Sequence, residues 1–344
     1  MKKLIFIVYL FCFVQAFAQQ NKSDDIVKAK HDYINFIQQH SHFINTPNIE
    51  LHYLQWGNPN KPAFIWLHGS LSNAIELEPF AKSITELGYQ LIAIDYYGHG
   101  QTPIPKGEFS VKTLMNDISH LLDSLSIQQC VIGGFSRGAY FATVFYDQFP
   151  NKVHALILED GGVSPFLEHY KLLSKKGLKK KFNSEINSRP NELFKTFDTE
   201  DEAYQVLQSF NELEDSQRYK NFYYIRKTAN GFSIYNGMDE LYGMNTYKNI
   251  KSLMKNKLTK NKFANQLMIF PFFETIQKTS IPVLLLEAKS PNDFFPNSIY
   301  YNKLKHSNKN ISLHTFEQSD HNIHYEESQK FINCIIDFLK HNKP

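Results

Sequence analysis

The feature that most constrains this fold is a regular alternation of short apolar runs with amphipathic segments. Between residues 49 and 160 of the 344-residue chain, apolar runs such as 62-PAFIWLHG-69 and 153-VHALILED-160 are separated by segments whose apolar residues recur at helical spacing. Each run is long enough for a buried strand, and each intervening segment is long enough for a crossover helix. This pattern is typical of a mostly parallel sheet flanked by helices, so we expect an α/β fold.

The alternation is interrupted once. Residues 161–279 contain helical segments but no convincing apolar strand, and the alternation resumes at 281-IPVLLLEA-288. The last segment of the chain has its apolar residues on one helical face. We therefore predict a core of residues 19–160 and 280–344 that carries a mainly helical insertion at residues 161–279.

The N-terminus has the three parts of a secretory signal peptide. Lys2 and Lys3 form a basic region, residues 4–14 an apolar region, and Ala16-Phe17-Ala18 a cleavage site, so residues 1–18 are predicted to be removed. About 11 apolar residues are too few to cross a hydrocarbon core of ~30 Å. We expect a periplasmic or secreted protein with no stable membrane anchor after cleavage; a retained anchor is the alternative.

Charge and cysteine content exclude several classes of function. Removing two lysines lowers the formal net charge from +3 to +1, so there is no electrostatic case for binding nucleic acid. The mature chain keeps Cys130 and Cys334, which we expect to be buried free thiols, with a disulfide as the alternative. The sequence has no CxxC pair and no histidine–cysteine cluster with ligand spacing, so we predict no metal and no cofactor.

One short motif indicates chemistry. The segment 134-GFSRG-138 follows an apolar run and precedes a helical segment, which places Ser136 at a tight strand-to-helix turn. A serine hydroxyl is a poor nucleophile, so it needs a base that a carboxylate orients. The base candidate is His321, directly after the last predicted strand, and His324 is the alternative.

Taken together, these segments resemble the α/β-hydrolase superfamily, specifically its members with a cap domain inserted after the sixth strand. The resemblance covers roughly residues 43–340 and rests on five segments in family order: 66-WLHGS-70, 95-DYYGHGQT-102, 134-GFSRG-138, 156-LILED-160 and 320-DHNIHYEESQKF-331. It implies that the insertion at residues 161–279 is the cap, and that Ser136 is the nucleophile.

The resemblance also implies roles for other residues. The backbone N–H groups of Ser70 and Arg137 are expected to form the oxyanion hole, where two donors stabilise the developing alkoxide. The family usually places the triad acid after the seventh strand, where Asp293 stands, although this loop is about two residues longer than usual. Some relatives take the acid from the end of the sixth strand. Asp293 is therefore predicted first, with Asp160 or another carboxylate as the alternative.

The identity of the nucleophile narrows the activity that the resemblance implies. Haloalkane dehalogenases and epoxide hydrolases need an aspartate as the nucleophile at this strand-to-helix turn, called the nucleophile elbow, and this chain has Ser136 there. Hydrolysis of a small-molecule carboxylic ester through an acyl-enzyme is therefore expected first. Amide or peptide cleavage, C–C bond hydrolysis and non-catalytic ligand binding are the alternatives.

Overall fold

Two compact units divide the chain. The computed structural model describes residues 25–166, 168, 174, 176–180, 183, 195–210, 213–234, 251–252, 262–291 and 297–344. The larger unit comprises residues 41–189 and 236–344, and the smaller comprises residues 1–40 and 190–235. The predicted signal peptide lies outside the described residues. No described helix is both long enough and apolar enough to span a membrane.

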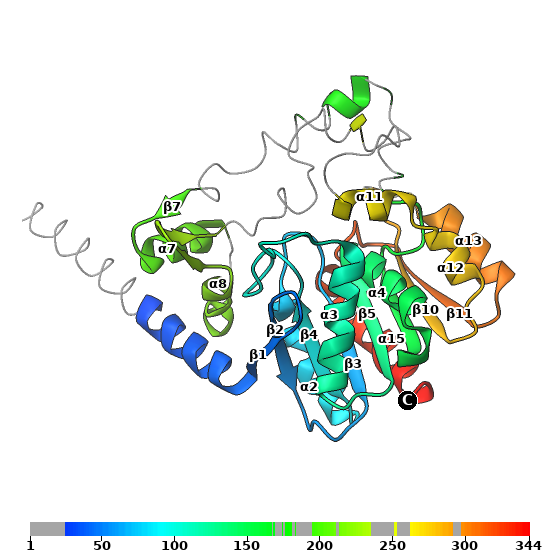
Figure 1. The fold of residues 1–344 in the computed structure, drawn as a ribbon, viewed down its shortest axis with the longest axis horizontal. Helices are drawn as coiled ribbons and strands as arrows, with labels where there is room; N and C mark the ends of the chain where they lie inside the picture. The colour runs from blue at the N-terminus through cyan, green and yellow to red at the C-terminus, as the bar shows by residue number, and fades with distance from the viewer. Residues whose placement is uncertain are drawn as a thin grey trace, which may run out of the picture. The chain divides into compact units, whose positions relative to one another are not determined.

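The larger unit is built on an eight-stranded sheet with the order β1-β2-β4-β3-β5-β6-β10-β11 (Figure 1). The strands are β1 (Ser41–Asn45), β2 (Glu50–Trp56), β3 (Ala63–Leu67), β4 (Gln90–Asp95), β5 (Cys130–Phe135), β6 (Val153–Glu159), β10 (Val283–Ala288) and β11 (Ile311–Phe316). Pairing is antiparallel for β1 with β2 and for β2 with β4, and parallel throughout the rest. The predicted fold class is therefore confirmed; β1 is a strand that the sequence analysis did not predict.

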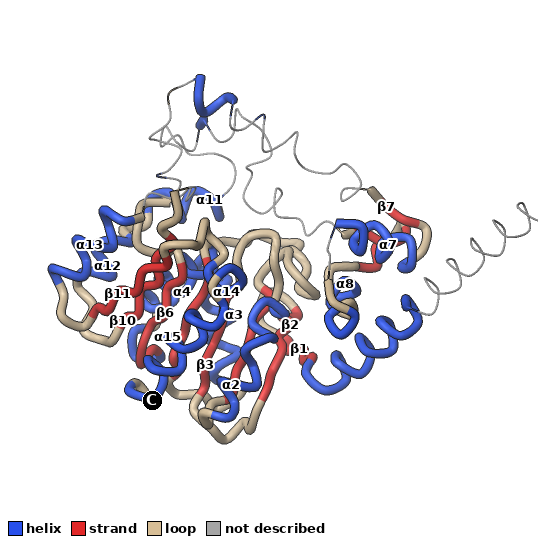
Figure 2. The backbone as a smooth tube through the Cα atoms, turned by 180° about the vertical axis from the view of Figure 1, so that it is seen from behind, coloured by secondary structure: helices blue, strands red, loops and turns tan. Residues whose placement is uncertain are grey.

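Helices cover both faces of this sheet. One face carries α3 (Val111–Ser124), α4 (Arg137–Gln148), α11 (Lys262–Ile269), α12 (Phe272–Gln277) and α13 (Ser298–Ser307), whose apolar residues share one core. The other face carries α2 (Ala81–Glu86) and α15 (Ser328–His341), seen from behind in Figure 2. Before α2, the segment Ala74–Phe80 forms the 3-10 helix η1, which contains Pro79. Proline has no N–H to donate, so it is tolerated poorly inside an α-helix.

Successive side chains of β3 pack into the cores on opposite faces of the sheet. Ile65 and Leu67 belong to the core beneath α3 and α4. Trp66 points the other way, with its ring 6.3 Å from that of Phe331 on α15. Both faces of this strand are buried because helices lie on each side, which is why it reads as a continuous apolar run.

The insertion after β6 is confirmed, since the chain leaves the sheet after Glu159 and returns to it at Val283. Its described part includes several helices, α11 and α12 among them, and a small sheet of order β7-β9-β8 that was not predicted. These strands are β7 (Thr196–Phe197), β8 (Arg226–Thr228) and β9 (Gly231–Ser233). Strands of two or three residues are too short to show an alternating pattern. The domain boundaries stay predictions.

The smaller unit has a core of its own. A helix over residues 25–40 packs with α7 (Glu200–Phe210) and α8 (Lys220–Tyr223). Phe222 is fully buried and stacks on Tyr33 and Tyr204, with ring centroids 5.7 and 4.4 Å away. Lys30 pairs with Glu200 at 2.6 Å on the rim of this core.

Both cysteines of the described residues carry free thiols, as expected. Cys130 is buried in β5, and burial raises the pKa of its thiol to about 12. Cys334 on α15 is only half-buried, so the expectation of burial is correct for Cys130 alone.

Candidate active site

Ser136 occupies the turn between β5 and α4, the strand–turn–helix that the motif predicts. Its φ of 50° and ψ of −111° lie in a region that residues with a Cβ rarely adopt. The N–H of Ser136 donates to the Glu159 carbonyl of β6 at 2.8 Å, and the Ser136 carbonyl accepts from the Ala139 N–H at 3.1 Å. The strained turn is therefore held from the sheet on one side and from α4 on the other.

Two glycines of the motif allow backbone segments to touch at this turn. A Cβ on Gly138 would lie 1.8 Å from the carbonyl oxygen of Leu67, at the end of β3. A Cβ on Gly134 would lie 2.4 Å from the carbonyl carbon of Gly138. No Cβ fits at either distance, so glycine is required at both positions for steric reasons.

Three side chains from separate strand ends meet at this turn. The Oγ of Ser136 lies 2.9 Å from Nε2 of His321, and Nδ1 of His321 lies 2.5 Å from Oδ2 of Asp160. His321 stands in the loop after β11, and Asp160 follows β6 directly with a positive φ of 38°. Because the Nδ1–H of His321 donates to the Asp160 carboxylate, Nε2 is the atom that can take the serine proton. This is the geometry of a serine–histidine–aspartate triad.

The structure thus brings together Ser136, His321 and Asp160, the alternative acid. Asp293, the acid predicted first, lies outside the described residues. The sequence carried the signal for Asp160, because it is the last residue of the apolar run 153-VHALILED-160 and strand ends supply the site residues of such sheets.

Asp160 is held by partners that the sequence analysis missed. Nδ2 of Asn297 donates to Oδ1 of Asp160 at 3.2 Å, and the hydroxyl of Ser164 donates to Oδ1 of Asn297 at 2.9 Å. Tyr140 on α4 continues this chain, with its hydroxyl 2.8 Å from that of Ser164. Burial raises the pKa of Asp160, whereas the hydrogen bonds from His321 and Asn297 oppose that rise. None of these polar partners belongs to a motif, so only their placement reveals them.

His324, the alternative base, contacts Glu159 and not Ser136. Its ring is fully buried, and Nδ1 lies 2.7 Å from Oε1 of Glu159, which also accepts from the His324 backbone N–H at 2.9 Å. Burial alone would lower the pKa of His324, but the charge and hydrogen bond of Glu159 hold this pKa above its ordinary value. His324 therefore ties helix α14 (Ile323–Glu326) to β6, and it is His321 that contacts Ser136.

The two residues predicted for the oxyanion hole stand next to the turn. Arg137 is the first residue of α4 and follows Ser136 in the chain. Ser70 lies in the loop after β3, whose last residue, Leu67, pairs with Gly134 of β5. The guanidinium carbon of Arg137 lies 5.4 Å from the ring centroid of Phe166, a cation–π contact. The oxyanion roles of Ser70 and Arg137 stay predictions.

A second serine–histidine–aspartate chain is structural in character. Ser41 Oγ lies 2.8 Å from Nε2 of His52, and Nδ1 of His52 lies 2.7 Å from Oδ2 of Asp95. Asp95 also accepts from the backbone N–H groups of Ala74 at 2.6 Å and Gln101 at 2.8 Å, so it joins two loops. His52 and Asp95 are fully buried, and Ser41 begins an edge strand rather than an elbow. The geometry of the three side chains alone therefore does not make an active site.

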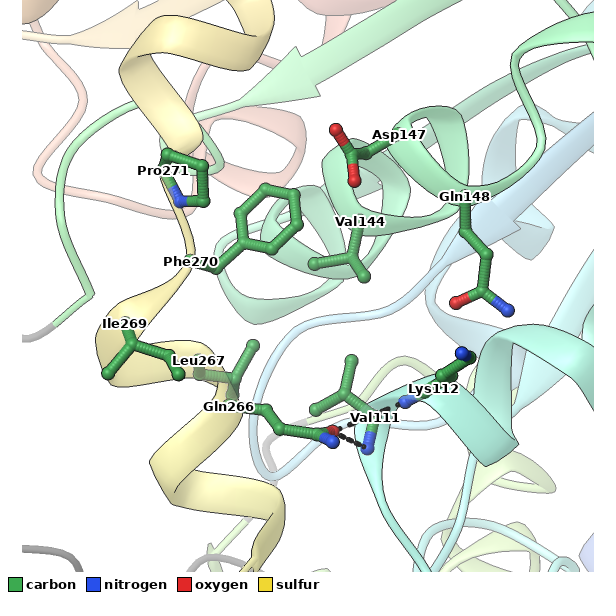
Figure 3. Close-up of a pocket in the computed structure, with 10 residues that line it drawn as sticks. All are labelled: Val111, Lys112, Val144, Asp147, Gln148, Gln266, Leu267, Ile269, Phe270 and Pro271. Carbon is green, nitrogen blue, oxygen red and sulfur yellow. Dashed lines mark hydrogen bonds between the residues drawn. The ribbon is translucent and has the colours of Figure 1, made fainter.

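The larger unit also contains a cavity of about 470 Å³. It lies between the start of α3, the C-terminal half of α4 and the α11–α12 junction, where Oε1 of Gln266 accepts from the backbone N–H of Val111 at 2.8 Å (Figure 3). No triad residue lines this cavity, so it is distinct from the site at Ser136. Among the described residues, no cluster of histidine, cysteine and carboxylate side chains could hold a metal ion.

A mostly parallel sheet with a serine elbow at its carboxyl edge is the arrangement of α/β hydrolases. The chain belongs to the alpha/beta hydrolase fold family, which matches residues 62–328.

Individual relatives match only part of the chain. Epoxide hydrolase 1 of Caenorhabditis elegans is 28% identical over 123 residues, which cover 34% of this chain and 29% of that protein. The sn-1-specific diacylglycerol lipase ABHD11 of Danio rerio is 30% identical over 112 residues, 32% of this chain and 34% of the relative. The matched segments therefore span about a third of these relatives.

Solved structures match over most of the chain. The thioesterase domain from the curacin biosynthetic pathway has a TM-score of 0.60 at 18% identity and covers 86% of this chain and 98% of its own. The carboxylesterase CesB from Bacillus subtilis has a TM-score of 0.58 at 14% identity and covers 92% and 98%. At these identities the likeness shows the fold.

Proposed function

We propose that this protein is a serine hydrolase that cleaves carboxylic esters of small molecules through an acyl-enzyme. The observation that carries the proposal is the continuous chain from Ser136 Oγ to His321 Nε2 and from His321 Nδ1 to Asp160. A hydroxyl is activated when an adjacent base accepts its proton and a carboxylate stabilises the resulting imidazolium. Each of these groups is in hydrogen-bonding contact with the next.

The proposed reaction assigns each group one step. Ser136 Oγ attacks the acyl carbon while Nε2 of His321 takes the hydroxyl proton, and the backbone N–H groups of Ser70 and Arg137 stabilise the oxyanion. His321 then donates that proton to the leaving alkoxide, and the alcohol departs. Water attacks the acyl-enzyme with His321 as base, which releases the carboxylic acid and restores Ser136. Asp160 keeps the proton on Nδ1 throughout.

The relatives support hydrolysis as the type of reaction. The kind of bond that is cleaved has to be argued from the residues of this chain. A carboxylesterase and a thioesterase domain share the fold, and a lipase shares part of the sequence. An epoxide hydrolase also matches, but a serine elbow suits acyl transfer. A serine nucleophile with its histidine and aspartate can hydrolyse an ester without a metal or a cofactor. Amide, peptide or C–C cleavage by the same triad is the alternative, and a substrate panel would reveal it.

Labelling with a fluorophosphonate probe tests the proposal. The wild type is expected to be labelled, and Ser136→Ala to remain unlabelled. Ser41→Ala is the matched control, because Ser41 also contacts a histidine that contacts an aspartate, and it should be labelled like wild type. Unlabelled wild type, or Ser136→Ala that is labelled equally well, refutes the proposal. A panel of p-nitrophenyl esters and p-nitroanilides then measures the ester-to-amide preference.

We also propose that the protein acts in the periplasm or outside the cell. The basic, apolar and small-residue regions of the first 18 residues support this. N-terminal sequencing of protein recovered from fractionated cells tests it. A mature end near Gln19 in the non-cytoplasmic fraction is expected, and an intact N-terminus in the cytoplasm contradicts it.

A further inference from the structure

The peptide bond between Gly69 and Ser70 is fixed by two hydrogen bonds to its carbonyl oxygen. The Gly69 carbonyl accepts from the hydroxyl of Tyr96 at 3.1 Å and from Nδ1 of His68 at 2.7 Å. In the preceding peptide, between His68 and Gly69, the N–H of Gly69 donates to Oε2 of Glu76 at 3.0 Å. A trans peptide directs its carbonyl and its N–H to opposite sides. Holding the Gly69 carbonyl therefore fixes the direction of the Ser70 N–H.

The side chains that hydrogen-bond to this loop, Tyr96 and Glu76, are themselves held in place by the core. Tyr96 is fully buried, with its ring stacked on that of His68 at 4.0 Å and edge-on to Phe141 at 4.9 Å. Glu76 is buried as well, and its Oε1 accepts from the indole N–H of Trp66 at 2.9 Å. Neither side chain can turn without breaking contacts in the core, so both act as fixed supports.

The same loop packs directly against the serine turn. A Cβ on Gly69 would lie 2.4 Å from the ring of Phe135, the residue before Ser136. That ring also lies 4.8 Å from the ring of His321. A shift of the Gly69 peptide therefore changes its position relative to both the nucleophile and the base.

We propose that Tyr96 is a positioning residue for the reaction, and that its hydroxyl, together with Glu76 on the other side of Gly69, aims the Ser70 N–H at the oxyanion. The inference rests on the proposed function, since it needs an oxyanion at Ser136. An oxyanion donor acts on the charge that develops in the transition state, and its effect depends on its direction. Loss of the tyrosine hydroxyl should therefore lower kcat while leaving KM nearly unchanged.

Neighbouring tyrosines allow a matched comparison of Tyr96→Phe with Tyr97→Phe. Both rings are fully buried, and each variant removes one hydroxyl that donates a hydrogen bond. The hydroxyl of Tyr97 donates to Asp117 rather than to the Gly69 loop. Tyr97→Phe should lose at least as much stability as Tyr96→Phe, because it removes a donor to a buried carboxylate. A loss of catalysis confined to Tyr96→Phe therefore reports the role of the contact with Gly69.

The expected result is specific to Tyr96. With p-nitrophenyl acetate, kcat of Tyr96→Phe should fall roughly tenfold, less than the ~100-fold or greater loss when a whole oxyanion donor is removed, and KM should stay within about twofold. Affinity for phenylboronic acid, which forms a tetrahedral adduct on serine, should fall by a similar factor. Tyr97→Phe should keep both values within about twofold of wild type.

Glu76→Gln provides a second, independent variant. In glutamine one of the two carboxylate oxygens becomes an NH2 group that cannot accept, so either the 3.0 Å contact with the Gly69 N–H or the 2.9 Å contact with the Trp66 indole is lost. It should show the same loss in kcat and in boronate affinity at unchanged KM. Equal kcat and boronate affinity in Tyr96→Phe and Tyr97→Phe, or a rise in KM alone, would overturn the inference while leaving an active, labelled wild type intact. A wild type that is neither labelled nor active would instead overturn the proposed function, and the inference with it.

Discussion

The carboxylate of Asp160 lies 2.5 Å from Nδ1 of His321, although 161 positions separate the two residues in the sequence. Their contact follows from strand order. Asp160 follows β6 and His321 follows β11, and β10 pairs in parallel with both of these strands. The carboxyl ends of parallel strands meet at one edge of a sheet, and ligand and catalytic sites gather there. Ser136 reaches the same edge because it follows β5, the next strand beyond β6.

Replacing the acid tests this contact directly. Asp160→Asn removes the charge that stabilises the imidazolium and favours the wrong histidine tautomer, so kcat for p-nitrophenyl acetate should fall by about 10³- to 10⁴-fold. Asp293→Asn is the paired variant and should stay within about threefold of wild type. If activity disappears in Asp293→Asn and survives in Asp160→Asn, the acid is Asp293.

Asn297 should matter through Asp160. Asn297→Ala removes a donor at 3.2 Å from the buried carboxylate, so kcat should fall roughly three- to tenfold with little change in KM. Asn297→Asp should cost more, because two adjacent buried carboxylates cannot both ionise. Asn302→Ala, in the helix that begins directly after Asn297, is the control, because Asn302 is exposed and its side-chain amide donates to the Ser298 carbonyl at 2.9 Å. Equal kinetics for Asn297→Ala and Asn302→Ala would count against this role.

His324 should make stability depend on pH. Glu159, Glu76 and Glu326 face its ring, and the pKa of His324 is raised above 6.5 because the acidic neighbours outweigh burial. The ion pair therefore contributes fully below the unfolded pKa and is lost as pH rises through the folded pKa. Urea unfolding of wild type and His324→Gln should differ more at about pH 6 than at about pH 9.

The control for this effect is His306→Gln, which changes an exposed histidine on α13. It should leave the free energy of unfolding nearly unchanged at both pH values. A gap between wild type and His324→Gln that is constant with pH, or that widens toward pH 9, would contradict a charged His324.

Gly138 should be intolerant of any side chain. Gly138→Ala places a Cβ 1.8 Å from the Leu67 carbonyl oxygen, a backbone atom that cannot move aside without displacing β3. We expect the free energy of unfolding to fall by more than about 3 kcal/mol in urea titrations. Gly107→Ala meets no atom within 4 Å and should change stability by less than about 0.5 kcal/mol. Similar stabilities for the two variants would show that the turn can relax.

The sequence alone determined the alternating pattern of strands and helices in the core, apart from β1, and the place of the serine in that pattern. Strand and helix periods are local, so the runs 62-PAFIWLHG-69 and 153-VHALILED-160 were predicted within a few residues of the observed bounds of β3 and β6. Ser136 was identified because its strand, turn and helix are consecutive in the chain. His321 was identified because it follows the last strand.

Only the tertiary structure decided which groups serve these residues. The partner of His321, the support that Asn297 gives to Asp160 and the contact of Tyr96 with Gly69 all join residues far apart in sequence. Such contacts depend on the order and register of strands in the sheet, which the local apolar pattern does not encode. The same limit explains His324: its spacing alone made it an alternative base, and burial against Glu159 made it an ion pair.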